Sequence, residues 1–192
     1  MTASDAPRFR RYPSEVRAAM LVDAGLACLA RGGITAFTVD NICREAGASR
    51  GLITHHFGSK DGLLAAVHAA AYAPVLAGIA AAPDLTALIG RMFAPAHFNR
   101  ESLNIWLALW AEIATNPGLQ AEHRRHYAAY RDAVVAAIVA HGRAVDAGVL
   151  AGAIIALADG LWLEQCIAPD LMSPQRAKAA CMMLLEPILG PL

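Results

Sequence analysis

The stretch that decides the fold is Gly47-Ala48-Ser49-Arg50-Gly51-Leu52-Ile53-Thr54-His55-His56-Phe57-Gly58-Ser59-Lys60. Gly47 suits the left-handed backbone that is common just past a helix, and Ser49 and Ser59 are residue types that begin helices. The stretch predicts a turn, a short polar helix and the start of a further helix. This order is typical of a helix-turn-helix, which presents its second helix to the major groove of DNA.

Helical signals recur along the rest of the chain, and strand signals are nearly absent, so we expect an all-α fold. Ser14 is expected to cap a first helix that ends at Gly32-Gly33, Thr38 a second over about 39–46, and Ser59 a fourth that bends at Pro74. Proline, asparagine and glycine breaks then predict helices at about 84–95, 101–115, 118–141, 146–167 and 174–188. We expect an N-terminal three-helix DNA-binding domain with the helix-turn-helix over residues 1–58, and a C-terminal helical ligand-binding and dimerisation domain over residues 59–192.

Charge is distributed unevenly along a chain that has no net charge. Residues 1–60 hold eight Arg or Lys against five Asp or Glu, and the remainder holds eight against eleven, so the basic surplus coincides with the candidate DNA reader. The four cysteines, Cys28, Cys43, Cys166 and Cys181, form no CxxC pair and predict neither a zinc knuckle nor a disulfide framework. Together with a polar N-terminus unlike a signal peptide, this favours a reduced, cytoplasmic setting.

One segment is long enough to span a membrane. Residues 62–83 contain no Asp, Glu, Lys or Arg. The apolar content is mostly alanine, however, and His68, Pro74 and Gly78 interrupt it. A buried connecting helix is therefore favoured over a spanning helix, and no membrane partner is expected.

Polar residues around the predicted helix-turn-helix are candidate DNA contacts. Thr38 and Ser49 begin helices, where free N–H groups favour a phosphate, and Lys60 begins the next helix. Arg50 matches the O6 and N7 edge of guanine, a pairing worth about 1–3 kcal/mol of discrimination, and Thr54 suits a thymine methyl or a phosphate. Arg8, Arg10 and Arg11 form an arm for phosphates or a minor groove. The candidate set is Arg10, Arg11, Thr38, Ser49, Arg50, Gly51, Thr54, His55, His56 and Lys60; the alternative is ordinary caps and a solvated face.

Residues 12–64 resemble the TetR family of regulators. The resemblance rests on Phe37-Thr38-Val39-Asp40-Asn41-Ile42, Ala46-Gly47-Ala48-Ser49-Arg50-Gly51, His56-Phe57 and Ser59-Lys60-Asp61-Gly62-Leu63-Leu64. Members of this family are homodimers whose last two helices pair in a four-helix bundle, and the resemblance implies the same here.

The C-terminal part resembles the regulatory domain of BetI-type repressors, which control glycine betaine synthesis and respond to choline. The matching residues are Trp106-Leu107-Ala108-Leu109-Trp110-Ala111, Asn116-Pro117-Gly118-Leu119 and Asp159-Gly160-Leu161-Trp162-Leu163. The resemblance implies a small-molecule inducer, choline or another organic cation.

The aromatic residues of the C-terminal part suit such a ligand on physical grounds. Trp106 and Trp110 share one helix face, Tyr127 and Tyr130 another, and aromatic faces attract quaternary ammonium groups. Glu112, Asp159 or Glu164 would supply the counter-charge. The candidate ligand set is Trp106, Trp110, Glu112, Tyr127, Tyr130, Asp159 and Trp162; the alternative is that these aromatic residues only fill the core.

Other chemistry is weakly supported. His123, His126 and Glu122 are spaced as zinc ligands on a helix, but no further ligands are evident, and Arg124 and Arg125 favour a solvated or dimer-edge face. No catalytic constellation, metal site or cofactor motif stands out, so no catalytic residue and no cofactor is expected.

We therefore expect a homodimeric repressor that an inducer releases from a palindromic DNA operator. The last two helices carry apolar surface for the dimer at Val149, Ile154, Ile155, Leu157, Leu161, Met182, Met183 and Leu185. The alternative is a helical small-molecule or partner-binding protein without DNA binding, and an enzyme is the least favoured hypothesis.

Overall fold

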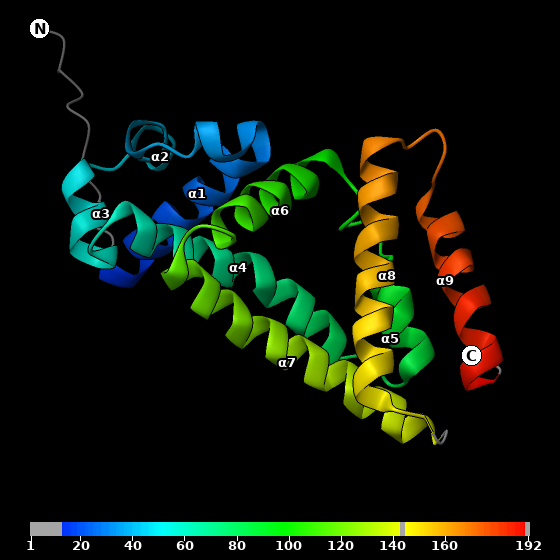
Figure 1. Ribbon diagram of the computed structural model, residues 1–192. Coiled ribbons are helices and arrows are strands. Elements are labelled where there is room, and N and C mark those ends of the chain that lie inside the picture. The colour runs from blue at the N-terminus through cyan, green and yellow to red at the C-terminus, as the bar shows by residue number, and fades with distance from the viewer. Residues whose placement is uncertain (1–12, 143–144, 191–192) are drawn as a thin grey trace, which may run out of the picture.

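The computed structural model describes residues 13–142 and 145–190, and these residues form helices joined by short connections without a strand. The helices are α1 (Ser14–Ala36), α2 (Val39–Ala46), α3 (Arg50–Phe57), α4 (Lys60–Ala80), α5 (Leu85–Met92), α6 (Arg100–Ile113), α7 (Pro117–His141), α8 (Ala147–Ile167) and α9 (Pro174–Leu189). Figure 1 shows α1, α2 and α3 together at one end, α8 and α9 at the other, and α4, α6 and α7 between them. The all-α prediction is confirmed.

Most predicted helix starts are confirmed, because the capping side chains make the expected hydrogen bonds. Thr38 accepts from the Asn41 N–H at 3.2 Å, and Ser59 accepts from the Gly62 N–H at 3.0 Å. Ser14 is a correction: it lies inside the first turn of α1, Pro13 occupies the cap position, and no side chain caps the helix.

The two predicted disruptions both lie inside long helices, and the bend expected at Pro74 stays a prediction. Gly32 and Gly33 leave the helical conformation, with φ of −152° and 60°, so the long α1 breaks where expected and resumes for its last turn. Pro74 lies inside α4, which continues to Ala80 as one helix.

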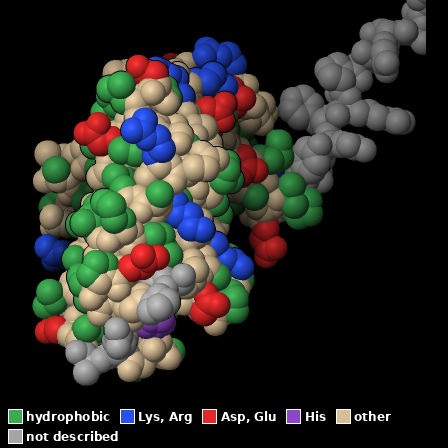
Figure 2. Space-filling model, turned by 90° about the vertical axis from the view of Figure 1, so that its right-hand side faces the viewer, with side chains coloured by type: hydrophobic (Ala, Val, Ile, Leu, Met, Phe, Trp, Pro, Cys, Tyr) green, Lys and Arg blue, Asp and Glu red, His purple; other side chains and the backbone are tan. Residues whose placement is uncertain are grey.

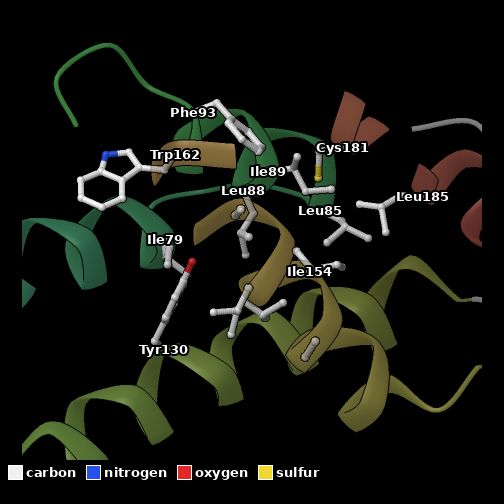
Figure 3. Packing of buried hydrophobic residues seen from close by; sticks show 14 of the residues in the cluster. Ile79, Leu85, Leu88, Ile89, Phe93, Tyr130, Ile154, Trp162, Cys181 and Leu185 are labelled. Atoms are coloured by element: carbon white, nitrogen blue, oxygen red, sulfur yellow. The ribbon is translucent and has the colours of Figure 1, made fainter. Parts of the chain in front are cut away.

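We call α1–α3, with the start of α4, the head, and the rest of the chain the body. Two clusters of buried residues hold the fold together, and Figure 3 shows the larger one, which lies in the body. The head cluster is built around Leu21, Phe37 and Ile42, and α4 completes it with Leu63 and Val67. The body cluster runs from Ile79 to Leu189. Trp106 of α6 packs against both clusters, so the head and the body share contacts across the predicted boundary at residue 58.

Three helices of the described chain are long and apolar enough to cross a membrane by length and composition: α1, α4 and α8. Each of them contributes buried residues to the two clusters, for example Leu29 of α1, Leu64 of α4 and Ile155 of α8.

The predicted apolar surface of α8 and α9 divides into a buried and an exposed part. Ile154, Ile155 and Leu185 are buried in the body core, and Leu157, Leu161 and Met182 are half-buried against it, so these six residues do not lie on an open face. Val149 and Met183 are exposed, and so are four residues that the sequence analysis did not single out: Ile167, Leu171, Leu184 and Ile188. Figure 2 looks onto this side and shows hydrophobic side chains spread over the surface among charged ones.

Candidate DNA-reading helix and ligand cavity

The turn of the helix-turn-helix is built by Gly47. This residue takes the left-handed conformation, with φ of 59° and ψ of 34°, and the Ala48 N–H donates back to the Cys43 carbonyl at 2.9 Å. Such a bond satisfies a carbonyl that the end of α2 would leave free. The prediction that Gly47 ends this helix is confirmed.

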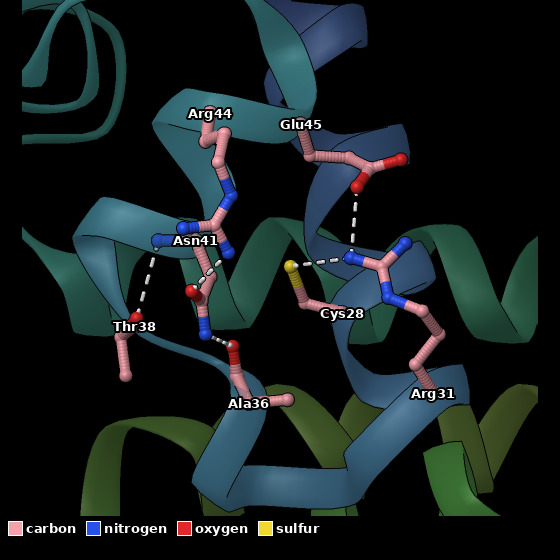
Figure 4. A network of polar contacts seen from close by, with 7 residues as sticks. All are labelled: Cys28, Arg31, Ala36, Thr38, Asn41, Arg44 and Glu45. Atoms are coloured by element: carbon pink, nitrogen blue, oxygen red, sulfur yellow. Dashed lines mark hydrogen bonds and ion pairs between the residues drawn. The ribbon is translucent and has the colours of Figure 1, made fainter.

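Side-chain contacts fix α2 against α1, and Figure 4 shows them. The Asn41 amide donates to the Ala36 carbonyl at 3.0 Å and accepts from Arg44 at 2.6 Å. Arg31 of α1 pairs with Glu45 at 2.8 Å, and this contact lowers the pKa of the Glu45 carboxyl. The α2 helix, which precedes α3 in the helix-turn-helix, is therefore held to α1 through both Asn41 and Glu45.

The α3 helix is anchored through one face and open on the other. Ile53 is buried and Phe57 half-buried in the head cluster, whereas Arg50, Thr54 and His55 are exposed. The start of α4 lies directly against the end of α3, because a Cβ on Gly62 would come within 2.0 Å of the Phe57 carbonyl oxygen. This close approach fixes the angle at which α3 projects.

Arg50 is not free in the unbound protein. Its guanidinium forms an ion pair with Asp40 of α2, although 72% of the Arg50 side chain is exposed. An ion pair this exposed contributes little to stability, so Arg50 can leave Asp40 for a base edge at small cost.

The other predicted DNA contacts are placed as follows. Gly51 and Lys60 are exposed. Thr38 is exposed, with its hydroxyl engaged in the cap of α2. Ser49 precedes α3 in the cap position but makes no capping bond, which leaves its hydroxyl available. His56 is half-buried, and its Nε2 is buried without a hydrogen-bond partner among the described residues. Arg8, Arg10 and Arg11 lie outside the described residues.

A cavity of about 170 Å³ lies in the body between α4, α5, α6, α7 and α8. Six of the seven predicted ligand residues line it: Trp106, Trp110, Tyr127, Tyr130, Asp159 and Trp162. The seventh, Glu112, lies outside this lining, and so does Glu164, which is exposed.

The aromatic rings of the cavity meet edge to face. The Tyr72 and Trp106 ring centres are 4.9 Å apart at 87°, and the Trp110 and Trp162 centres are 5.8 Å apart at 82°. The indole N–H of Trp162 donates to the His97 carbonyl at 2.7 Å, which satisfies its one polar group. The rings are thus locked by packing, and their faces and edges form the wall of the cavity.

Asp159 supplies the negative charge of this cavity. Asp159 is exposed and lines the cavity, yet the protein around its carboxyl removes enough water to raise its pKa to about 6. Burial first, and the charge of Asp159 second, raise the pKa of the Tyr72 and Tyr130 hydroxyls. None of the ion pairs of the described residues includes Asp159, so no described Lys, Arg or His pairs with its carboxylate.

Sequence reasoning missed several residues of the cavity, namely Tyr72, Arg91, His97 and His123. His123 corrects an interpretation, since it is half-buried and lines the cavity instead of a solvated or dimer-edge face. The only signal for Tyr72 is its place in the uncharged 62–83 segment, and nothing in the sequence aligns that segment with Trp106.

His123 and His126 both pack against a buried histidine of α4, His68, with ring centres 5.5 Å away. Nδ1 of His123 lies 3.3 Å from Nε2 of His68, which is fully buried on α4. Burial first, and the neighbouring His123 and His126 second, lower the pKa of His68 to about 4, so His68 is neutral at pH 7. Burial also lowers the pKa of His123. Within residues 13–142 and 145–190, no three His, Cys, Asp or Glu side chains are arranged to hold a metal ion.

An exposed second helix on a rigid helix-turn-helix, joined to an all-helical body, defines a DNA-binding transcriptional regulator. Residues 21–67 match the family of bacterial regulatory proteins called tetR, and residues 81–190 match the C-terminal domain of BetI-type transcriptional repressors. The chain belongs to the TetR family and carries a BetI-type C-terminal domain. This family is non-enzymatic, and its helix-turn-helix binds DNA, which decides against the two alternative hypotheses.

Known proteins resemble the chain over nearly its whole length. The HTH-type transcriptional regulator BetI of Burkholderia mallei (strain NCTC 10229) is 29% identical over 92% of this chain and 95% of that protein. A structure described as a transcriptional regulator from Pseudomonas aeruginosa PAO1 is 32% identical, with a TM-score of 0.82 and 95% of each chain covered. A structure described as a regulator from Saccharomonospora viridis, in complex with choline, shares the fold at 23% identity and a TM-score of 0.74, over 91% of this chain and 97% of that one.

Proposed function

We propose that this protein is a cytoplasmic, homodimeric repressor that leaves a palindromic operator when a small organic cation such as choline binds the α4–α8 cavity. The observation that carries the proposal is Asp159, a carboxylate without an ion-pair partner in the described part of the chain, in a cavity walled by Trp106, Trp110 and Trp162. A quaternary ammonium there would gain cation–π contacts of about 2 kcal/mol each when desolvated, together with the charge of Asp159. The choline complex of the S. viridis protein supports this choice of ligand.

The dimer would form through α8 and α9. Val149 and Ile167 bound an exposed stripe on α8 whose intervening positions include the small residues Ala153, Ala156 and Gly160, which let a second helix approach closely. Met183, Leu184 and Ile188 extend the apolar surface onto α9. Two α3 helices would then reach major grooves about one turn of DNA apart, roughly 34–36 Å.

Within each protomer we propose the division at residue 58, so that α1–α3 act as the DNA reader. The exposed groups of the head would divide the work: Arg50, Thr54 and His55 at bases, and Ser49 and Lys60 at phosphates. This division is supported by the exposure of all five residues on one short segment. The first turns of α4 complete the core of the DNA-binding head, and its last turns line the cavity. A ligand in the cavity can therefore change the position of the head through α4.

The test is a thermal-shift titration with choline combined with operator release. Choline at a hundred times its Kd should stabilise the protein by about 2.7 kcal/mol and should release a palindromic fragment from the upstream region of the gene. Asp159→Asn should lose both effects. Asp132→Asn, on the exposed face of α7 and outside the cavity lining, should keep both. Equal responses of the two variants would contradict the assignment of Asp159.

A further inference from the structure

The cavity carries a positive group as well as a negative one. Arg91 of α5 lines it, and its guanidinium is held by the carbonyls of Gly78 at 2.6 Å and Ala81 at 2.9 Å. A guanidinium has five N–H donors, so most of them remain available after these two bonds. Among the described residues, Arg91 forms no ion pair with a carboxylate.

Arg91 and Asp159 do not neutralise each other. They form no ion pair, and the raised pKa of Asp159 has burial as its cause without a contribution from a nearby cation. The two carbonyls at the end of α4 hold Arg91 in place, where the helix dipole favours a cation. The charge of Asp159 acts instead on Tyr72 and Tyr130.

The two charges therefore mark different parts of one cavity. Tyr72 marks the part affected by Asp159, and Gly78 marks the part where Arg91 is held. Six residues of α4 separate them, a rise of about 9 Å. A ligand that reaches from one part to the other meets a negative group at one end and a positive group at the other.

We propose that the ligand of this cavity is a zwitterion, an ammonium compound that also bears a carboxylate, with the ammonium against Asp159 and the aromatic rings and the carboxylate against Arg91. This inference rests on the proposed function and narrows its ligand class. A simple cation fills only the Asp159 part and leaves the guanidinium without an anion. The carboxylate of a zwitterion forms charge-assisted hydrogen bonds with Arg91, which are about twice as strong as neutral ones.

The test is calorimetric titration of the intact protein with three probes that share a quaternary ammonium. Tetramethylammonium carries the cation alone, choline adds a hydroxyl, and glycine betaine adds a carboxylate. We expect glycine betaine to bind at least tenfold more tightly than tetramethylammonium, with choline between them. Arg91→Gln, which keeps an N–H donor for the carbonyls, should remove that tenfold preference and leave the affinity for tetramethylammonium within twofold.

The controls separate the possible failures. Arg124→Gln removes a guanidinium on the exposed face of α7 and should leave all three affinities unchanged. If glycine betaine binds wild-type protein no more tightly than tetramethylammonium, the zwitterion inference is wrong and the proposed function stands. If Arg91→Gln keeps the preference, Arg91 only caps α4 and the inference is again wrong. If none of the probes binds, the proposed function itself fails. The wild-type series decides even if Arg91→Gln does not fold.

Discussion

At the scale of single residues, two cations of the head have different surroundings. Arg50 begins α3 and pairs with Asp40, whereas Lys60 begins α4 and forms no ion pair among the described residues. A guanidinium already oriented by a carboxylate suits bidentate recognition, and a lone ammonium suits a phosphate.

Substitution of these two cations should therefore separate specificity from affinity. Arg50→Ala should relax sequence preference at one base pair by about 1–3 kcal/mol. Lys60→Ala should weaken binding to all sequences alike and reduce the salt slope by about 1. Fluorescence anisotropy with operator and mutated duplexes at several salt concentrations measures both effects. A loss of sequence preference in Lys60→Ala would reverse the assigned roles.

The pH dependence of ligand binding should report the carboxyl of Asp159. Its pKa in the free protein is about 6, and a bound cation favours the ionised form and lowers that pKa. Affinity for choline should be constant above pH 7 and should fall up to tenfold per pH unit below 6, because binding must then release a proton.

His97, His123 and Arg91 also line the cavity, and protonation of the two histidines would repel a cation in the same direction. Calorimetric titration of the Asp159→Asn variant with choline at several pH values measures how much of the pH dependence comes from the two histidines. This variant should bind weakly and lose most of the pH dependence, and an unchanged pH profile would show that the histidines dominate.

At the scale of elements, α6 is the helix that joins the ligand cavity to the head. Trp106 and Trp110 line the cavity, while the Asn104 amide on the same helix donates to the Ala30 carbonyl of α1 at 2.7 Å. That bond lies just before the break of α1 at Gly32 and Gly33. A displacement of α6 by a ligand would therefore reach the α1 end that supports α2.

Removal of this bond should weaken the coupling between the two sites. Asn104→Ala should leave choline affinity unchanged, since Asn104 does not line the cavity, and should reduce ligand-dependent operator release about fivefold, in line with one hydrogen bond of about 1 kcal/mol. Operator titrations with and without choline measure the ratio, with Glu101→Gln, exposed on the same helix, as control. If Asn104→Ala releases the operator as readily as the wild-type protein does, this hydrogen bond of α6 does not couple the cavity to the head.

Local signals predicted the elements better than their arrangement. Thr38, Gly47 and Ser59 act through hydrogen bonds and backbone conformations within four or five residues of themselves, so the sequence alone identifies them. The cavity draws Tyr72, Arg91 and Asp159 from three helices, and their meeting depends on packing between distant segments. The same cause explains Glu112, which the sequence placed with the ligand set and the structure places outside the cavity lining.

At the scale of the whole molecule, the exposed apolar side chains of α8 and α9 call for a partner. Met183 is 67% exposed, as is expected of a residue that a second protomer would cover. A charge at this position would be buried without a partner in a dimer and would be solvated in a monomer.

Met183→Glu should therefore yield a monomer that fails to hold a palindromic operator at moderate salt. Leu107→Glu is the control, because Leu107 is 41% exposed on α6, a helix that contributes no residue to the proposed interface. Sedimentation velocity measures the oligomeric state of each variant, and an electrophoretic mobility shift measures its binding to the operator. A dimeric Met183→Glu variant would exclude this face as the interface.

The distribution of tryptophan has an optical consequence. The chain contains three tryptophans, and Trp106, Trp110 and Trp162 all line the cavity. The N-terminal head contributes none, so the tryptophan emission of the protein comes from the ligand cavity alone. Quenching or a spectral shift of that emission then reports cavity occupancy without a label, even while DNA is bound, and a stopped-flow trace could time ligand arrival against operator departure.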